Sequence, residues 1–138
     1  MKPTQVTIEA MASAPVEKVW DAWTNPEHIV KWNFASEDWQ CPSASNDLRV
    51  GGTYKARMEA KDGSFGFDFE AVYQEVIPHQ RISYVMADGR VATTTFENLG
   101  SSTKVITIFE AESENSVEMQ QQGWQAILNN FVKHVSKQ

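Results

Sequence analysis

Histidine and cysteine are the side chains that most often bind metals or act as nucleophiles, and the sequence contains only three histidines and one cysteine. None of His28, His79 and His134 stands at metal-ligand spacing from another histidine or from Cys41. All three histidines fall in segments that we expect on the surface. No basic residue near Cys41 in the sequence would activate its thiol. The sequence therefore predicts no metal site and no catalytic residue, and Cys41 is interpreted as a buried structural thiol.

Two other patterns resemble chemical motifs but have a structural explanation. Asp68 and Glu70 share one face of a predicted strand, and the alternation places them opposite Phe67 and Phe69, so they should face solvent. The pair Gly51–Gly52 does not lead into a helix that begins with Lys and Ser or Thr, as a phosphate loop would. It predicts a tight turn or a bulge instead, and no cofactor is predicted.

The aromatic residues are a stronger candidate, because the chain contains five Trp, seven Phe and three Tyr. Many of them have a strand parity or helix position that directs them to one concave face, where they would line an apolar pocket with few polar anchors. Phe65 and Phe96 share this parity, and the hydroxyls of Tyr54, Tyr84 and Thr94 would orient a ligand. The alternative interpretation is that the rings simply fill the core. The predicted ligand-binding residues are Trp32, Phe34, Tyr54, Met58, Phe67, Phe69, Tyr84 and Trp124.

Composition and charge restrict the classes of function. Hydrophobic residues make up 41% of the 138 positions and charged residues 22%, which is typical of a globular protein, and we expect one domain over residues 1–138. The net charge of −6 should repel phosphate backbones and anionic lipid. The single cysteine cannot form an internal disulfide, which fits a reducing compartment. The sequence has no apolar run of about 18 residues and no apolar signal segment behind Met1–Gln5, so we expect a cytoplasmic monomer or homodimer. We expect neither nucleic-acid binding nor membrane insertion.

The elements that must position the aromatic residues follow from hydrophobic periodicity. Thr4–Met11 alternates as a half-buried strand does. Pro15 should begin a first short helix, because a proline at the first helical position lacks an N–H that would have no partner there. Asn25–Pro26 repeats this signal and begins a second short helix that runs through Trp32.

The remainder predicts strands, tight turns and one long helix. Asp62–Gly63 and Asp88–Gly89 are hairpin signals, because a type I′ turn needs residues that tolerate positive φ, and Gly100 marks a third turn. Asn115 should cap the last helix, with Glu118 completing a capping box. The predicted strands are Trp39–Cys41, Thr53–Ala60, Phe65–Gln74, a strand around Ile82 and Tyr84, Val91–Glu97 and Thr103–Ala111.

Consecutive strands joined by tight turns form a meander whose apolar face needs a cover. Only the C-terminal helix is long enough, and its apolar stripe would face the sheet. The predicted fold is therefore α+β, a helix-grip arrangement in which a curved antiparallel sheet of about seven strands surrounds a long C-terminal helix. Two short helices follow its first strand. The apolar stripe of the long helix consists of Trp124, Ile127, Leu128, Phe131 and Val135.

Several collinear segments resemble one known family, the homologues of the activator of the ninety-kilodalton heat-shock protein ATPase. The segments are Ala14–His28 through Trp32, Leu48–Tyr54, Ala71–Pro78 with Ile82–Tyr84, and Gly123–Trp124. This family belongs to the START-like, birch-pollen-allergen-like superfamily, which also contains polyketide cyclases and lipid-transfer domains. The resemblance implies a helix-grip fold with a cavity between the sheet and the long helix.

Three functions remain open at this point. We favour a domain that binds a hydrophobic or amphipathic small molecule, such as a lipid, in an apolar cavity. A polyketide cyclase- or hydrolase-like enzyme would use the same cavity, but it needs an inward titratable residue with a perturbed pKa, and the sequence offers no clear candidate. The third is a co-chaperone-like protein of the stress response that binds a chaperone or a client protein, for which an exposed apolar patch would be the sign.

Overall fold

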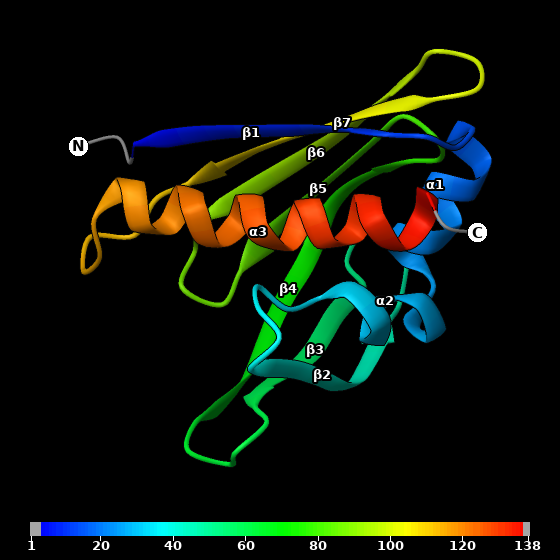
Figure 1. The fold of residues 1–138 in the computed structure, drawn as a ribbon. Coiled ribbons are helices and arrows are strands. Elements are labelled where there is room, and N and C mark those ends of the chain that lie inside the picture. Colours follow the sequence, from blue (N-terminus) through cyan, green and yellow to red (C-terminus); the bar gives the residue numbers. More distant parts are fainter. Residues whose placement is uncertain (1–3, 137–138) are drawn as a thin grey trace.

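One antiparallel sheet curves around a long helix in the computed structural model, which describes residues 4–136 (Figure 1). Residues 1–3 and 137–138 lie outside the described residues. Residues 1–3 belong to the segment that we predicted to lack an export signal. The first strand, β1 (Gln5–Ala12), leads into two short helices, α1 (Val16–Thr24) and α2 (Pro26–Trp32). This order of strand and two short helices confirms the prediction.

Both helix starts use the proline signals in the sequence. Pro15 takes the N-cap position of α1, so the helix begins at Val16, one residue later than predicted. At α2 the Asn25 side chain accepts a hydrogen bond of 3.0 Å from the Glu27 backbone N–H, and Pro26 follows as the first helical residue. The side chain thus satisfies one of the backbone donors that every helix start leaves without an intrahelical partner.

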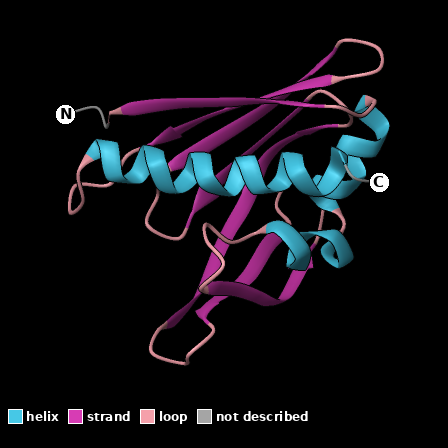
Figure 2. Cartoon of the chain, in the orientation of Figure 1, coloured by secondary structure: helices cyan, strands magenta, loops and turns pink. Residues whose placement is uncertain are grey.

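The sheet contains seven strands in the order β1-β7-β6-β5-β4-β3-β2, and all neighbouring pairs are antiparallel. The chain from β2 to β7 is a meander, and β1 adds to its far edge beside β7 (Figure 2). The predicted α+β helix-grip fold is confirmed. The remaining strands are β2 (Trp39–Asn46), β3 (Thr53–Ala60), β4 (Gly66–Ile77), β5 (Arg81–Met86), β6 (Val91–Asn98) and β7 (Thr103–Glu110).

Strand β2 is longer than the three residues predicted for it. Pro42 follows the predicted residues directly, and a proline cannot donate to a ladder. The pairing with β3 shifts register between Gln40 and Ser43, and β2 is an edge strand. A bulge on an edge tolerates proline, so the strand continues to Asn46.

The two Asp–Gly turns lie where they were predicted. Gly63 (φ 78°) connects β3 to β4, and Gly89 (φ 90°) connects β5 to β6. A side chain with a Cβ rarely adopts such angles, which is why glycine follows aspartate at both turns.

The last helix, α3 (Val117–Ser136), lies across the concave face of the sheet, with α1 and α2 near its C-terminal end (Figure 1). Its buried residues are Leu128, Phe131 and Val135, as the predicted apolar stripe requires. Trp124 stacks on Phe109 of β7 with ring centroids 4.0 Å apart. The helix and the sheet therefore share one core.

The predicted capping box at the start of α3 is wrong. The Ser116 hydroxyl, not the Asn115 side chain, accepts a hydrogen bond from a helix backbone donor, the Met119 N–H at 3.1 Å. Since the helix begins at Val117, Glu118 is one position too early to complete a box. The Asn115 amide instead donates to the Glu112 carboxylate.

A membrane span would need a long apolar helix, and none of the helices within residues 4–136 is both long and apolar enough to be one.

Candidate functional site

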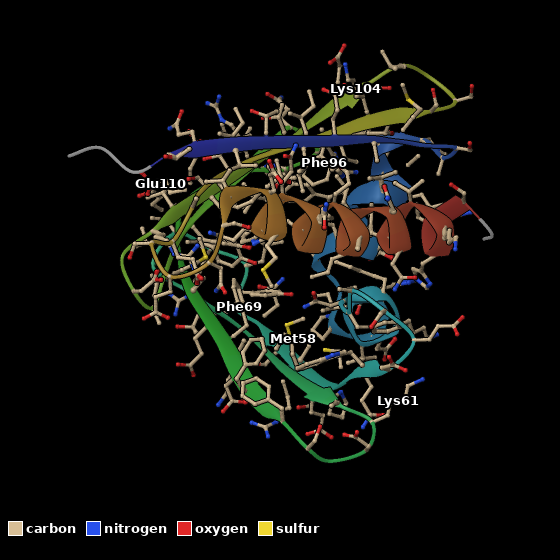
Figure 3. All side chains as sticks on the ribbon, turned by 60° about the vertical axis from the view of Figure 1, so that its left-hand side comes forward. Met58, Lys61, Phe69, Phe96, Lys104 and Glu110 are labelled. Carbon is tan, nitrogen blue, oxygen red and sulfur yellow. The ribbon has the colours of Figure 1, made fainter. Side chains whose placement is uncertain are left out.

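A pocket of about 310 Å³ lies between the sheet and α3. Figure 3 shows two of its residues, Met58 and Phe69, beneath α3 on the strands β3 and β4. Because Phe67 lines the pocket and keeps 40% of its surface exposed, the pocket reaches the solvent beside β4. Seven of the eight residues predicted from the sequence line it: Trp32, Tyr54, Met58, Phe67, Phe69, Tyr84 and Trp124.

The eighth residue, Phe34, does not line this pocket. It follows α2 directly and is half-buried, and its backbone carbonyl lies 3.5 Å from the Asn130 amide of α3. Phe65 also departs from the prediction, since it precedes β4 and is 60% exposed. Phe96 does point to the concave side, where its ring packs edge-on against Trp20 of α1 at 5.5 Å.

The rings that line the pocket are held by hydrogen bonds from neighbouring elements. Trp32 donates from Nε1 to the Ala22 carbonyl at 2.9 Å, and the Asn130 amide donates to the Trp32 carbonyl at 2.8 Å. The Tyr54 hydroxyl accepts from the Asn33 amide at 3.0 Å. These bonds connect α1, α2, α3 and the sheet, so the pocket wall depends on the docking of all three helices.

Four polar residues of the lining were missed from the sequence: Asn33, Arg90, Thr107 and Glu112. The Thr107 hydroxyl lies 2.7 Å from that of Thr94, which was proposed as a ligand-orienting group. Arg90 follows the Asp88–Gly89 turn, and the sequence does place it at a hairpin end. No local signal shows that this hairpin end and the segment before α3 border the same pocket.

Burial controls the acid–base state of the three tyrosines that line the pocket. Burial raises the pKa of Tyr54, Tyr73 and Tyr84 well above the ordinary value for tyrosine, because the phenolate form loses hydration. The positive charge of Arg90 opposes part of this rise in the pKa of Tyr84. Near neutral pH these side chains are therefore neutral phenols, which donate hydrogen bonds but do not act as bases.

The histidines correct another expectation. His28 and His134 were read as separate surface residues, but Nδ1 of His28 lies 2.9 Å from Nε2 of His134, and both are half-buried. Asp21 approaches Nε2 of His28 at 3.4 Å. This pair joins α2 to α3 and lies outside the pocket lining. Within residues 4–136, the carboxylates, histidines and the cysteine form no group of three or more that would hold a metal ion.

The other candidate nucleophile is structural. Cys41 is buried, as predicted, and its thiol donates to the Ser43 carbonyl at 3.4 Å. Burial raises the pKa of this thiol, which keeps it protonated and unreactive.

The carboxylates of β4 also behave as predicted. Asp68 and Glu70 are exposed and face the side chains of Arg57 and Lys55, each across an ion pair of 3.6 Å. They lie outside the pocket lining.

A seven-stranded antiparallel sheet that grips a C-terminal helix, with an aromatic pocket between them, defines a START-like helix-grip domain. The family model described as "Activator of Hsp90 ATPase homolog 1-like protein" matches residues 13–136, and the chain belongs to this family. Comparison with curated proteins gives no match.

Solved structures agree with this assignment. The chain is similar to an AHSA1-like protein from Aeromonas hydrophila, with 41% identity and a TM-score of 0.91, over 97% of this chain and 93% of the other. A protein from Cytophaga hutchinsonii is 44% identical, with a TM-score of 0.83 and coverage of 96% and 92%. A protein from Chromobacterium violaceum is 27% identical, with a TM-score of 0.86 and coverage of 97% and 99%.

Proposed function

We propose that the chain binds a hydrophobic or amphipathic small molecule in the pocket between the sheet and α3. The observation that carries the proposal is the lining, in which three tryptophans, three tyrosines and two phenylalanines surround a volume of about 310 Å³. Ligand pockets are typically apolar clefts of roughly 300–1,000 Å³ with a few polar groups that orient the ligand. This pocket lies at the small end of that range.

The energy for binding would come from the apolar surface that the ligand removes from water. This transfer contributes about 25 cal/mol per Å², against the cost of association. The lining is fixed before the ligand arrives, because Trp32 and Tyr54 are held by hydrogen bonds to other elements. Less ordering on binding leaves more of the transfer energy available as affinity.

The test is calorimetric titration with isopropylnaphthalene, an apolar probe, into the wild-type protein and two tryptophan variants. Met58→Trp would place a larger ring at a position that lines the pocket. Val72→Trp is the matched control, because Val72 is 47% exposed and lies outside the lining. We expect saturable binding that Met58→Trp removes and Val72→Trp retains. Equal binding by both variants, or no binding by the wild-type protein, would reject the proposal.

We further propose that the ligand leaves the pocket chemically unchanged. Glu112 is the carboxylate that lines the pocket, and its Oε1 already accepts a hydrogen bond from Asn115. The three tyrosines are neutral near pH 7 for the reason given above, so they do not supply a base. Mass spectrometry of each binder after prolonged incubation checks this point. Turnover that Glu112→Gln abolishes would instead establish the cyclase- or hydrolase-like alternative.

A second candidate function, binding to a chaperone or a client protein, is favoured by one specific observation. Trp39, Phe65 and Phe67 form a cluster of contacting rings, with centroids 5.9 to 6.2 Å apart, and Phe65 is largely exposed. Exposed aromatic clusters are typical of protein interaction sites. We expect Phe65→Ser to abolish any stimulation of a purified ninety-kilodalton chaperone ATPase, without changing the unfolding midpoint. If the unaltered chain gives no stimulation, this function is rejected.

A further inference from the structure

The Tyr84 hydroxyl differs from those of the other two tyrosines in the pocket. Tyr54 accepts a hydrogen bond from Asn33, and Tyr73 donates one of 2.7 Å to the Asn46 side chain. Tyr84 is held only through its ring, which stacks on Tyr54 at 6.1 Å and meets Phe69 at 5.9 Å. Within residues 4–136 its hydroxyl makes no hydrogen bond to the protein.

That free hydroxyl faces open space rather than packed protein. Among the described residues, no side-chain nitrogen or oxygen that is completely closed off lacks a hydrogen-bond partner. The unpartnered Tyr84 oxygen must therefore remain accessible. Tyr84 lines the pocket, so the pocket is the space that this hydroxyl reaches.

Arg90 adds a second donor to the same part of the pocket. Its Nε donates to the Asp88 carboxylate at 2.7 Å, and its Nη1 donates to the Glu110 carbonyl at 2.9 Å. Its Nη2 makes no hydrogen bond within the part of the chain that the structure describes. Tyr84 pairs with Ala92 across the β5–β6 hairpin, and the Met86 N–H donates to the Arg90 carbonyl at 2.7 Å. Because side chains two residues apart share a face, Tyr84 and Arg90 lie on the same side of this hairpin, and both line the pocket. A ligand oxygen between the two would accept from both.

The surrounding charges decide which oxygen fits. The positive charge of Arg90 is already paired with Asp88, and Glu112 is the other charged residue of the described lining. The Glu110 carboxylate lies at the same sheet end, where it accepts a hydrogen bond of 2.6 Å from the Val91 N–H. One cation among three carboxylates disfavours a ligand that carries its own negative charge. The site needs an acceptor without a charge.

We propose that the natural ligand is an apolar molecule with an uncharged carbonyl oxygen, which accepts hydrogen bonds from the Tyr84 hydroxyl and from Arg90. The inference rests on the proposed binding function and assigns the chemical class of the ligand, a ketone, aldehyde or ester rather than a carboxylic acid.

Three ligands with one naphthalene ring test the inference. Acetylnaphthalene carries the carbonyl, isopropylnaphthalene has nearly the same shape without the oxygen, and naphthoate carries a carboxylate. We expect the acetyl compound to bind roughly threefold to tenfold more tightly than the isopropyl compound, since a net hydrogen bond contributes that much. Naphthoate should bind most weakly. Calorimetric titration of the wild-type protein measures all three dissociation constants.

Variants then assign the preference to particular groups. Tyr84→Phe should reduce the preference for acetylnaphthalene over isopropylnaphthalene, because only the bond from Arg90 then remains, and it should leave the affinity for isopropylnaphthalene unchanged. Tyr73→Phe is the matched control, because the Tyr73 hydroxyl already donates to Asn46 and is not available to the ligand. This variant should keep the wild-type preference for acetylnaphthalene. Asp88→Asn should release the charge of Arg90 and improve the binding of naphthoate alone.

The outcomes separate this inference from the function on which it rests. If isopropylnaphthalene binds as tightly as the acetyl compound and Tyr84→Phe has no selective effect, the pocket binds ligands but the carbonyl inference is wrong. Tightest binding of naphthoate by the wild-type protein would likewise overturn the inference, in favour of an acidic ligand. If none of the three binds, both proposals fail.

Discussion

Phe109 of β7 and Phe67 of β4 are the same residue type in one sheet, but their surroundings differ. Phe109 is completely buried and stacks on Trp124, whereas Phe67 lines the pocket and keeps 40% of its surface exposed. A fully buried ring is in contact with protein on all sides, whereas a ring beside an open pocket is in contact on only some. Removing the buried ring therefore eliminates more packing contacts. The stability that each ring contributes therefore depends on what lies behind it.

We expect Phe109→Ala to lower the free energy of unfolding by roughly 3–5 kcal/mol. Phe67→Ala should cost clearly less, because water already reaches its position, and the exposed Phe65→Ala should cost least of the three. Denaturant unfolding followed by circular dichroism measures the three values. Equal losses for Phe109→Ala and Phe67→Ala would contradict the description of an open pocket.

The tyrosines allow a direct test of burial, because Tyr54, Tyr73 and Tyr84 are all the tyrosines of the chain. A tyrosine in water ionises near pH 10. Burial raises the pKa of all three, so the native protein should show almost no tyrosinate absorbance at pH 10, and the same chain in denaturant should be about half ionised.

The same pKa shifts set the direction of the alkaline stability change. The folded-state pKa values are raised, so the unfolded chain releases protons first, and stability falls as pH rises above about 10. Tyrosinate should therefore appear together with unfolding in a spectrophotometric titration. Half-ionisation at pH 10 with the native circular dichroism spectrum intact would contradict the burial of these rings.

At the scale of elements, the start of α3 depends on one hydroxyl. Ser116 accepts from the Met119 N–H, while Asn115 contacts Glu112 outside the helix. We expect Ser116→Ala to lower the free energy of unfolding by about 1 kcal/mol and Asn115→Ala to have a smaller effect. Denaturant unfolding of the two variants makes the comparison, and the reverse order would restore Asn115 as the cap.

The contact between α2 and α3 should depend on pH through His28 and His134. Burial, then the charges of His28 and Lys31, lower the pKa of His134 below its ordinary value of about 6.5. Because the folded-state pKa is the lower one, stability is complete above pH 6.5 and is lost as pH falls through the folded-state value. Asp21, which faces His28, offsets part of the repulsion.

We therefore expect the thermal unfolding midpoint to fall between pH 7.5 and pH 5, and to fall less in His134→Gln. The matched control is His79→Asn, since His79 is exposed and its positive φ of 65° suits asparagine. An unchanged pH dependence in His134→Gln would show that other groups are responsible for the acid sensitivity.

At the scale of the whole molecule, local signals account for the elements and only partly for the site. Alternation and the two Asp–Gly turns predict the meander because both effects act within one strand or one hairpin. The same alternation brings most of the predicted rings to the pocket. It misplaces Phe65, which lies at the hairpin end before β4, where its ring contacts Trp39 and Phe67 but remains 60% exposed and outside the pocket lining.

The groups that sequence analysis missed share one property. Arg90 meets Glu110 across 20 positions, and His28 meets His134 across 106 positions. Such contacts depend on where α3 docks and on which strand ends meet, and neither is encoded in a local pattern. A charged residue at a turn also looks like any other solvated residue, so Arg90 had no feature that indicated a pocket.

The pairing of β1 with β7 also has a consequence for how the chain folds. Gln5 pairs with Glu110 and Ala12 with Thr103, whereas the other strand pairs form between neighbours in the sequence. Loop closure over such a distance is slow, so the hairpins from β2 to β7 should form first and β1 should join last. In refolding kinetics Ile8→Ala should then give a φ-value near zero, and Ile82→Ala in β5 a higher one. On the ribosome, the first strand would remain unpaired, with Val6 and Ile8 uncovered, until β7 has been synthesised.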